Sequence, residues 1–180
     1  MADDDDLHLL VQRARHRDSD AWEAVYRRAY PRLIAYARRR VHSPDAAEDV
    51  VSETMARALG AIDRFTWKGA GFDAWLYGIC RNVVLESVRS ASRISADFLP
   101  EIQARERGPL ETVVSADEAG EVRQAFATLS ATDQEILELR VVGQLDARAV
   151  GDVLDMRSGA VRTAQSRAIG RLCHLLGGRI

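Results

Sequence analysis

The sequence predicts an all-α protein made of two small helical domains joined by a flexible linker. Apolar residues recur at three- and four-residue spacing over most of the 180 residues, and no stretch shows the alternation typical of a strand. Only four prolines interrupt these periods. The expected division is an N-terminal tail with a first helix, a helical bundle, a linker without sustained period, and a second helical domain, at residues 1–19, 20–93, 94–115 and 116–180.

Composition excludes several classes of protein. A net charge of −2 argues against an indiscriminate DNA binder. The sign is unevenly distributed: residues 3–6 are all Asp, acids predominate between 94 and 121, and residues 156–180 contain arginines and no acid. Cys80 and Cys173 lack metal-ligand spacing, so we expect free thiols, no metal and no cofactor. No apolar run suits a membrane span, which predicts no membrane insertion and a cytoplasmic location.

In the first domain, helices are expected at residues 7–17 and from Ser19 or Asp20 to about Arg40. Pro31 should kink or divide the second of these helices. Ser43-Pro44-Asp45 has the form of a helix start, with a hydroxyl cap and a proline at the first helical position.

The helix after Ser43 places its acids on the face opposite its apolar residues. Asp49 and Glu53 are like charges four residues apart, which costs a few tenths of a kcal/mol in an isolated helix. Such a face suits a basic partner, and a plain solvated face explains it equally well.

Residues 60–71 are expected to form a loop, followed by a helix from Phe72 or Asp73 to about Ser90. Aromatic and basic residues alternate here. Rings can stack on unpaired bases while guanidinium groups hold phosphates, so this segment suits single-stranded nucleic acid. The alternative is that the rings are core residues: it is favoured for Trp75 and left open for Trp67 and Tyr77.

The second domain should begin near Ala116. Ser130 to Asp133 resembles a capping box, before a helix over residues 131–142. That helix is expected to bury four apolar side chains: Ile136, Leu137, Leu139 and Val141.

Two short amphipathic helices around a tight turn follow. Asp146 is placed to cap the first of them, and Asp155 can adopt the left-handed conformation of the turn. Gly159 should open the second helix, whose expected buried stripe is Val161, Ala164, Ala168, Ile169 and Leu172. Its other face is cationic, as a helix that reads a DNA major groove requires. A helical hairpin with solvated arginines is the alternative.

In their order and separation, residues 30–41, 43–59, 72–89 and 126–172 resemble segments of the extracytoplasmic-function (ECF, group IV) sigma factors, of the sigma-70 family. The resemblance implies a region 2 type bundle and a region 4 type helix-turn-helix domain. It implies an initiation subunit of RNA polymerase with no catalytic site, which binds core polymerase at the clamp helices of the largest subunit and at the beta flap. It also implies recognition and melting of promoter DNA, and control by an anti-sigma factor.

The resemblance assigns three sets of residues. Docking on core polymerase falls to Asp45, Glu48, Asp49, Ser52 and Glu53. Capture of the melted −10 element falls to Arg64, Phe65, Trp67, Lys68, Tyr77, Arg81, Asn82 and Arg89. Reading of the −35 duplex falls to Arg157, Ser158, Arg162, Thr163, Ser166, Arg167 and Arg171.

The chain departs from the family pattern at several of these positions. Ser52 stands where Gln is usual, which should weaken one contact with the clamp. Arg157 stands where proline or serine often starts the recognition helix, so the cap could shift to Ser158. Ala164 stands where a further arginine is common.

Two other classes of protein fit parts of the sequence. A duplex-binding regulator would act alone through the C-terminal helices and would bind DNA without polymerase. A helical adaptor that binds only proteins would keep its function after charge reversal at Arg162 and Arg167.

Overall fold

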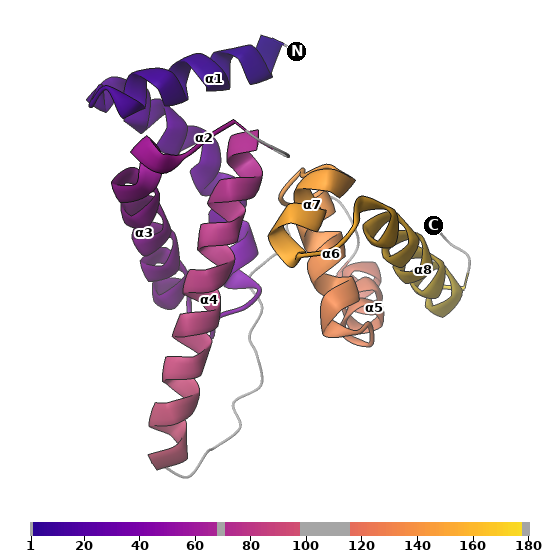
Figure 1. The fold of residues 1–180 in the computed structure, drawn as a ribbon. Helices are drawn as coiled ribbons and strands as arrows, with labels where there is room; N and C mark the ends of the chain where they lie inside the picture. Colours follow the sequence, from indigo (N-terminus) through magenta and orange to yellow (C-terminus); the bar gives the residue numbers. More distant parts are fainter. Residues whose placement is uncertain (1, 68–70, 98–115, 178–180) are drawn as a thin grey trace.

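The structure, a computed structural model, describes residues 2–67, 71–97 and 116–177, and every regular element in these ranges is a helix (Figure 1). The predicted all-α fold is confirmed. The first domain contains α1 (Ala2–Arg15), α2 (Ser19–Arg38), α3 (Pro44–Ala61), the 3-10 turn η1 (Ile62–Arg64) and α4 (Gly71–Asp97). The second domain contains α5 (Ala116–Ala127), α6 (Ala131–Val141), α7 (Ala147–Leu154) and α8 (Ser158–Leu175).

Side-chain caps set the start of four helices. The side chains of Asp18, Ser43 and Ser130 each accept a hydrogen bond at 3.1 Å from an amide in the first turn of α2, α3 and α6. Asp146 accepts one at 2.7 Å from an amide of α7. These bonds satisfy amides that have no partner within the helix. The caps predicted at Ser43, Ser130 and Asp146 are confirmed, whereas Asp18 was not predicted.

Two helix limits and one expected interruption of a helix differ from expectation. α1 begins at Ala2 rather than Leu7. α2 runs past Pro31 without a break, because apolar residues on both sides of the proline are buried and their packing outweighs one lost hydrogen bond. α4 continues to Asp97 rather than ending near Ser90, since residues 91–97 contain no glycine or proline.

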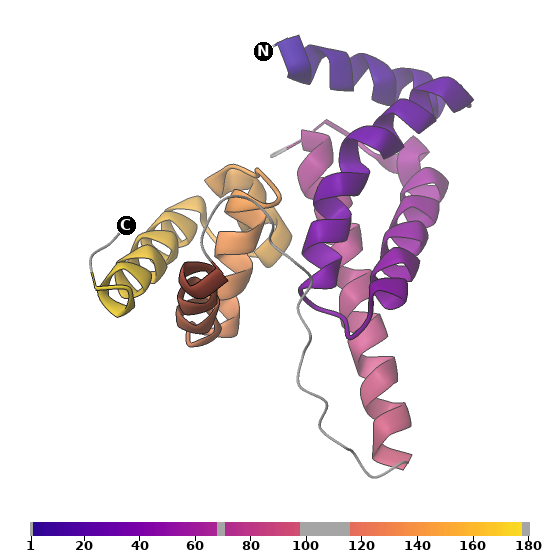
Figure 2. The same ribbon diagram turned by 180° about the vertical axis from the view of Figure 1, so that it is seen from behind.

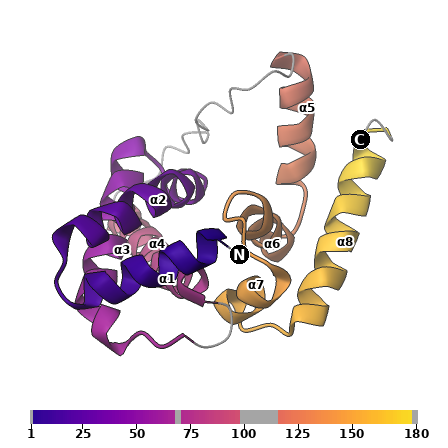
Figure 3. The ribbon, with the colours of Figure 1, turned by 90° about the horizontal axis from the view of Figure 1, so that it is seen from above.

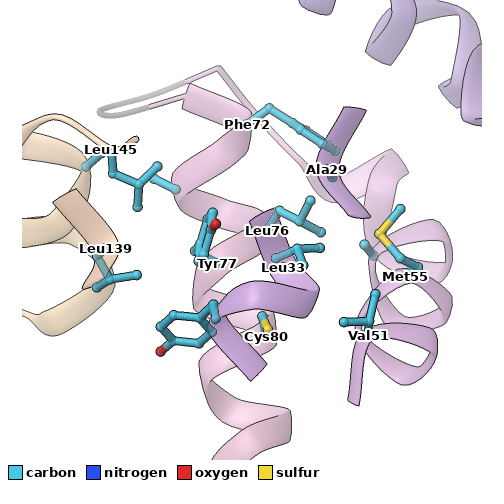
Figure 4. Packing of buried hydrophobic residues seen from close by; sticks show 14 of the residues in the cluster. Ala29, Leu33, Val51, Met55, Phe72, Leu76, Tyr77, Cys80, Leu139 and Leu145 are labelled. Carbon is cyan, nitrogen blue, oxygen red and sulfur yellow. The ribbon is translucent and has the colours of Figure 1, made fainter. Parts of the chain in front are cut away.

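The core of the first domain lies between α2, α3 and α4, and α1 lies across one end of these helices (Figure 2). Leu33 of α2, Val51 of α3 and Leu76 of α4 are almost completely buried (Figure 4). Cys80 of α4 also lies in this core, where burial raises the pKa of its thiol to about 11. This thiol is therefore uncharged at neutral pH.

The second domain packs around α6 and α7. Ile136, Val150 and Val161 are completely buried. A smaller cluster of Leu129, Leu137 and Ala168, with Phe126 of α5 packed against it, joins α5 and α8 to α6. Two residues expected in the core are exposed, Val141 at 70% and Ile169 at 43%. For Ile169 the reason is geometric, because α8 is buried along its Val161–Ala164–Ala168 stripe and Ile169 lies beside that stripe. Val141 is the last residue of α6.

The two domains contact each other. α7 packs against α4, and one continuous cluster of buried apolar residues crosses from the first domain into the second. Leu139 and Leu145 of the second domain lie toward Tyr77 of α4 (Figure 4). Most of the expected linker, residues 98–115, lies outside the described residues, and its residues 94–97 belong to α4.

The turn between α7 and α8 closes tightly over a buried glycine, which generates a stability prediction. A Cβ at Gly151 would lie 2.4 Å from the carbonyl oxygen of Met156, which is backbone and cannot rotate away. Gly151→Ala should therefore lower the free energy of unfolding by about 1–3 kcal/mol, measured by urea denaturation.

Gly170→Ala is the matched control, because a Cβ there meets no atom within 4 Å. This second variant should be stabilised by about 0.5–1 kcal/mol, since alanine is the better helix former. Equal effects of the two substitutions would contradict the close approach at Gly151.

Candidate nucleic-acid interface

The first candidate surface is the exposed face of α8, which lies on the far side of α6 and α7 from the first domain (Figure 3). Arg162, Thr163, Ser166 and Arg167 are all exposed there. No described acidic residue pairs with Arg162 or Arg167. This part of α8 is therefore a cationic face that is free to contact an anion.

The turn before α8 fixes the angle between α7 and α8. Asp155 adopts the expected left-handed conformation, with φ 54° and ψ 48°, and the amide of Met156 donates to the carbonyl of Gly151 at 2.8 Å. Arg140 of α6 stabilises this arrangement, because its guanidinium donates hydrogen bonds to the side chain of Gln165 and to the backbone carbonyl of Leu145. These hydrogen bonds therefore hold α8 in a defined orientation against α6 and α7.

Two residues assigned to this surface differ from the others. Arg157 occupies the cap position of α8 without a side-chain cap hydrogen bond, so the expected shift of the cap to Ser158 is wrong; Ser158 lies in the first turn. Arg171 is turned toward α6, where its guanidinium donates to Asp133 at 2.9 Å. Because the Asp133 side chain is only 12% exposed, Arg171 satisfies a nearly buried carboxylate rather than offering a free charge.

The second candidate surface combines the η1 loop with α4. Arg64, Asn82 and Arg89 are exposed, and Arg81 is half-buried. With Trp75 and α7 residues of the second domain, Arg64 and Asn82 line a cleft of about 540 Å³. Lys68, also assigned here, lies outside the described residues.

Phe65 and Tyr77 are not exposed as their assignment requires. Phe65 is 4% exposed and packs against Phe72 and Trp75, with ring centroids 5.3 and 5.0 Å away. Tyr77 is 2% exposed at the contact between the domains. Burial raises the pKa of Tyr77, whose hydroxyl has no hydrogen-bond partner among the described residues. In this arrangement of the chain, neither ring can stack on a base.

Trp67 and Trp75 are both half-buried. Trp67 stacks on His8 of α1 with ring centroids 4.5 Å apart, and Trp75 packs against the core as favoured from the sequence. The contact between His8 and Trp67 ties α1 to the loop, and the sequence contained no signal for it because the two residues are 59 positions apart in the chain.

The third candidate surface is the acidic face of α3. All five assigned residues are exposed: Asp45, Glu48, Asp49, Ser52 and Glu53. Glu53 accepts a hydrogen bond from Arg57 at 2.6 Å, and Arg57 also reaches Glu86 of α4 at 2.7 Å. The hydrogen bonding of Arg57 to Glu86 lowers the pKa of Glu86 below its ordinary value. Arg57 therefore anchors one end of the acidic face, a role that the sequence alone did not indicate.

Other types of site find no support in the described residues. No group of three or more His, Cys, Asp or Glu residues is arranged there to hold a metal ion. No helix in the described ranges has both the length and the apolar character needed to cross a membrane.

Comparison with known proteins identifies the family. Residues 25–94 match the model of Sigma-70 region 2. The chain is 31% identical to the ECF RNA polymerase sigma factor BldN of Streptomyces coelicolor, over 97% of this chain and 68% of BldN. It is 33% identical to the ECF RNA polymerase sigma factor SigD of Mycobacterium tuberculosis, over 92% of this chain and 82% of SigD. The chain belongs to the ECF sigma factors of RNA polymerase.

Solved structures show the same fold. The sigma factor RpoE in complex with the anti-sigma factor NepR from Bartonella quintana matches with a TM-score of 0.67 and 23% identity, over 88% of this chain and 98% of RpoE. CnrH in complex with the cytosolic domain of CnrY matches with a TM-score of 0.68 and 22% identity, over 96% of this chain and 97% of CnrH. The two-domain helical architecture is thus shared with both structures.

Arg167 and Arg171, four residues apart on α8, should differ in their effect on stability. Arg171→Ala leaves the nearly buried Asp133 without its partner, so the free energy of unfolding should fall by about 1 kcal/mol. Arg167→Ala should leave it within about 0.5 kcal/mol of the wild-type value, because Arg167 is exposed. Urea denaturation of both variants tests this difference, and an unchanged stability of Arg171→Ala would contradict a structural role for that residue.

Proposed function

We propose that this chain is a group IV sigma factor that acts in the cytoplasm, binds core RNA polymerase, recognises −10 and −35 promoter elements and promotes melting of the DNA. The observation that carries the proposal is the presence of three separate surfaces of different chemistry: an acidic face on α3, a cleft beside α4 and a cationic face on α8. No catalytic site of its own is needed, because polymerase supplies the chemistry.

The −35 element is assigned to α7 and α8, acting as a helix-turn-helix. A DNA major groove admits one helix, and the face of α8 with Arg162, Thr163, Ser166 and Arg167 has the required donors. Arg157 and Ser158 lie at the amino end of α8, where amides and positive charge favour a backbone phosphate.

The −10 element is assigned to the cleft beside α4. Arg64 and Asn82 line the cleft with exposed polar and cationic groups, and Trp75 lines it with an aromatic ring. Arg89 is exposed farther along α4. Melting would follow from trapping unpaired bases, where the binding energy offsets the stacking that is lost. Phe65 then contributes by holding the loop in place rather than by touching DNA.

Core polymerase is assigned to both domains, through the clamp helices of the largest subunit on the acidic face of α3 and through the beta flap on the second domain. Asp49 and Ser52 have no hydrogen-bond or ion-pair partner among the described residues and are available to a basic surface, while Arg57 orients Glu53. The exposed like charges of α3 would be relieved by a cationic partner.

Control by an anti-sigma factor is the last part of the proposal. It is supported by the similarity in fold to RpoE, a sigma factor crystallised with the anti-sigma factor NepR. A pull-down from native cells tests this part, and recovery of polymerase with no inhibitor protein would count against it.

Reading of the duplex is tested by alanine substitution at Arg162 and Arg167. Each change should weaken promoter binding by the holoenzyme about tenfold, since a good contact with a base contributes about 1–3 kcal/mol. The measurement is a gel shift with and without core polymerase on promoter fragments mapped after overexpression. Arg27→Ala, in the other domain and exposed, is the control.

Tight operator binding without polymerase would instead identify a duplex-binding regulator. Unchanged transcription after both arginine substitutions would identify an adaptor that binds only proteins. Either result would overturn the proposed function.

Docking on polymerase is tested by charge reversal on α3. Asp49→Arg should lower the affinity for core polymerase by about tenfold or more, because a cation then faces a basic partner. Fluorescence anisotropy with purified core polymerase measures the affinity. Glu23→Arg, an equally drastic change at an exposed position of α2, should have little effect. Equal losses in the two variants would show that general electrostatics, rather than a specific face, governs docking.

A further inference from the structure

α1 lies across the end of the first domain that carries the loop after η1 (Figure 1). Its inner face is buried there: Leu7, Val11 and Ala14 are each 3% exposed or less. α1 contacts η1 as well as α2, so it packs on the start of the loop and not only on the helix that follows it in the chain. None of the three candidate surfaces includes a residue of α1.

His8 of α1 holds one end of this loop by stacking on Trp67. The ring centroids are 4.5 Å apart and the ring planes are inclined by 29°. The side-chain amide of Gln12 donates to His8 Nε2 at 3.4 Å and so helps to orient the imidazole. The indole N–H of Trp67 is buried and has no hydrogen-bond partner among the described residues. Trp67 is therefore held by ring contacts, with His8 and with Phe65.

Arg15, at the other end of α1, holds the start of the same loop. Its guanidinium donates to the backbone carbonyl of Asp63 at 3.2 Å. Arg17, just beyond α1, donates to the Asp63 carboxylate at 3.4 Å. Because the carbonyl belongs to the main chain, the bond from Arg15 fixes the backbone at the residue before Arg64.

The spacing of the two attachments on α1 matches the length of the loop. His8 and Arg15 are seven residues apart, which places them on one face of the helix with a separation of about 10 Å along its axis. Asp63 and Trp67 are four residues apart, and a chain of that length spans at most about 14 Å. α1 therefore fixes both ends of the stretch 63–67.

The residues between these attachments line the cleft beside α4. Arg64, Phe65 and Thr66 all contribute to its wall, and Arg64 and Thr66 are exposed while Phe65 is buried. Residues 65–67 belong to no helix, so the shape of this wall depends on contacts with other elements. Phe65 is held by rings of α4, and the two ends of the stretch are held by α1.

We propose that His8 is a positioning residue for capture of the melted −10 strand, because its stack on Trp67 fixes the stretch 63–67 and with it the wall of the cleft. The inference rests on the proposed assignment of the −10 element to that cleft. His8 itself touches no base. A wall that is already held in shape loses less conformational freedom when a strand binds, so the strand binds more tightly.

The test uses the holoenzyme assembled from the full chain and core polymerase. The probe is a fluorescein-labelled single strand with the non-template −10 sequence of a promoter mapped after overexpression, and its binding is followed by anisotropy at constant salt. His8→Ala removes the stack and should weaken binding about fivefold, the factor that one aromatic pair of ordinary strength supplies. His8→Leu, which is apolar but has no planar ring, should weaken it as much.

Two further variants are the controls. His8→Phe keeps a planar ring against Trp67 but cannot accept the hydrogen bond from Gln12, and it should bind the strand within about twofold of the wild type. His16→Ala removes the same side chain from an exposed position beyond the end of α1 and should leave strand binding unchanged. All these variants should bind core polymerase with wild-type affinity, since docking is assigned to other helices.

A second measurement follows the stack in the absence of DNA. The full chain is labelled with fluorotryptophan, and the fluorine NMR resonance of Trp67 is identified by its loss in Trp67→Phe. His8→Ala should move this resonance toward the position of free fluorotryptophan, because the ring leaves the stack. His8→Phe should keep the resonance displaced, and the resonance of Trp22 should not move in either variant. A Trp67 resonance that stays in place in His8→Ala would overturn the inference.

Trp67→Ala separates failure of this inference from failure of the proposed function. If Trp67→Ala weakens strand binding and His8→Ala does not, the positioning role of His8 is overturned and the proposed function stands. If Trp67→Ala has no effect, the assignment of the −10 element to this part of the chain is overturned, and the role of His8 with it.

Two other results would also overturn the inference. Tighter binding of the strand by His8→Ala would show that His8 covers Trp67 rather than positions it. A loss in His8→Phe equal to that in His8→Ala would show that the ring stack is not the cause.

Discussion

The arrangement of the described helices depends on α4, which buries side chains against the first domain and against the second. One side packs against α2 and α3 through Leu76 and Cys80, and the other faces the second domain through Tyr77. A helix that is apolar on both sides cannot leave either side in water without cost. The second domain therefore has a defined place on the first, although the residues joining them in sequence show no sustained helical period.

Charged residues have different roles at the contact between the domains and on the exposed surfaces. At the contact, Glu135 and Glu138 are paired with arginines and nearly buried, so they specify how the domains meet. On α3 the acids remain exposed, and on α8 Arg162 and Arg167 remain exposed without a described partner. The net charge of the chain is near neutral even though α3 carries an acidic face and α8 a cationic face. Each face is available to a partner of the opposite charge.

The aromatic residues near α4 show how position decides between packing and recognition. Phe65, Phe72 and Trp75 form an edge-to-face and tilted cluster, which holds the loop after η1 against the start of α4. Trp67 lies at the rim of this cluster and stacks on His8. The loop is therefore shaped by buried rings, while the polar residues around it line the cleft.

Local rules in the sequence determined the helices and the chemistry of their faces. Caps such as Ser43 and Asp146, the left-handed turn at Asp155 and the exposed acids of α3 follow from neighbours a few positions apart, so a single stretch of sequence contains the whole signal. Whether Tyr77 or Arg81 is free was decided only in the tertiary structure. Their partners lie in the second domain, more than fifty residues away, and periodicity identifies a helix face without saying which element will cover it. For the same reason the sequence did not distinguish Arg171 from the free arginines of α8. Only the structure shows that Asp133 of α6 pairs with it.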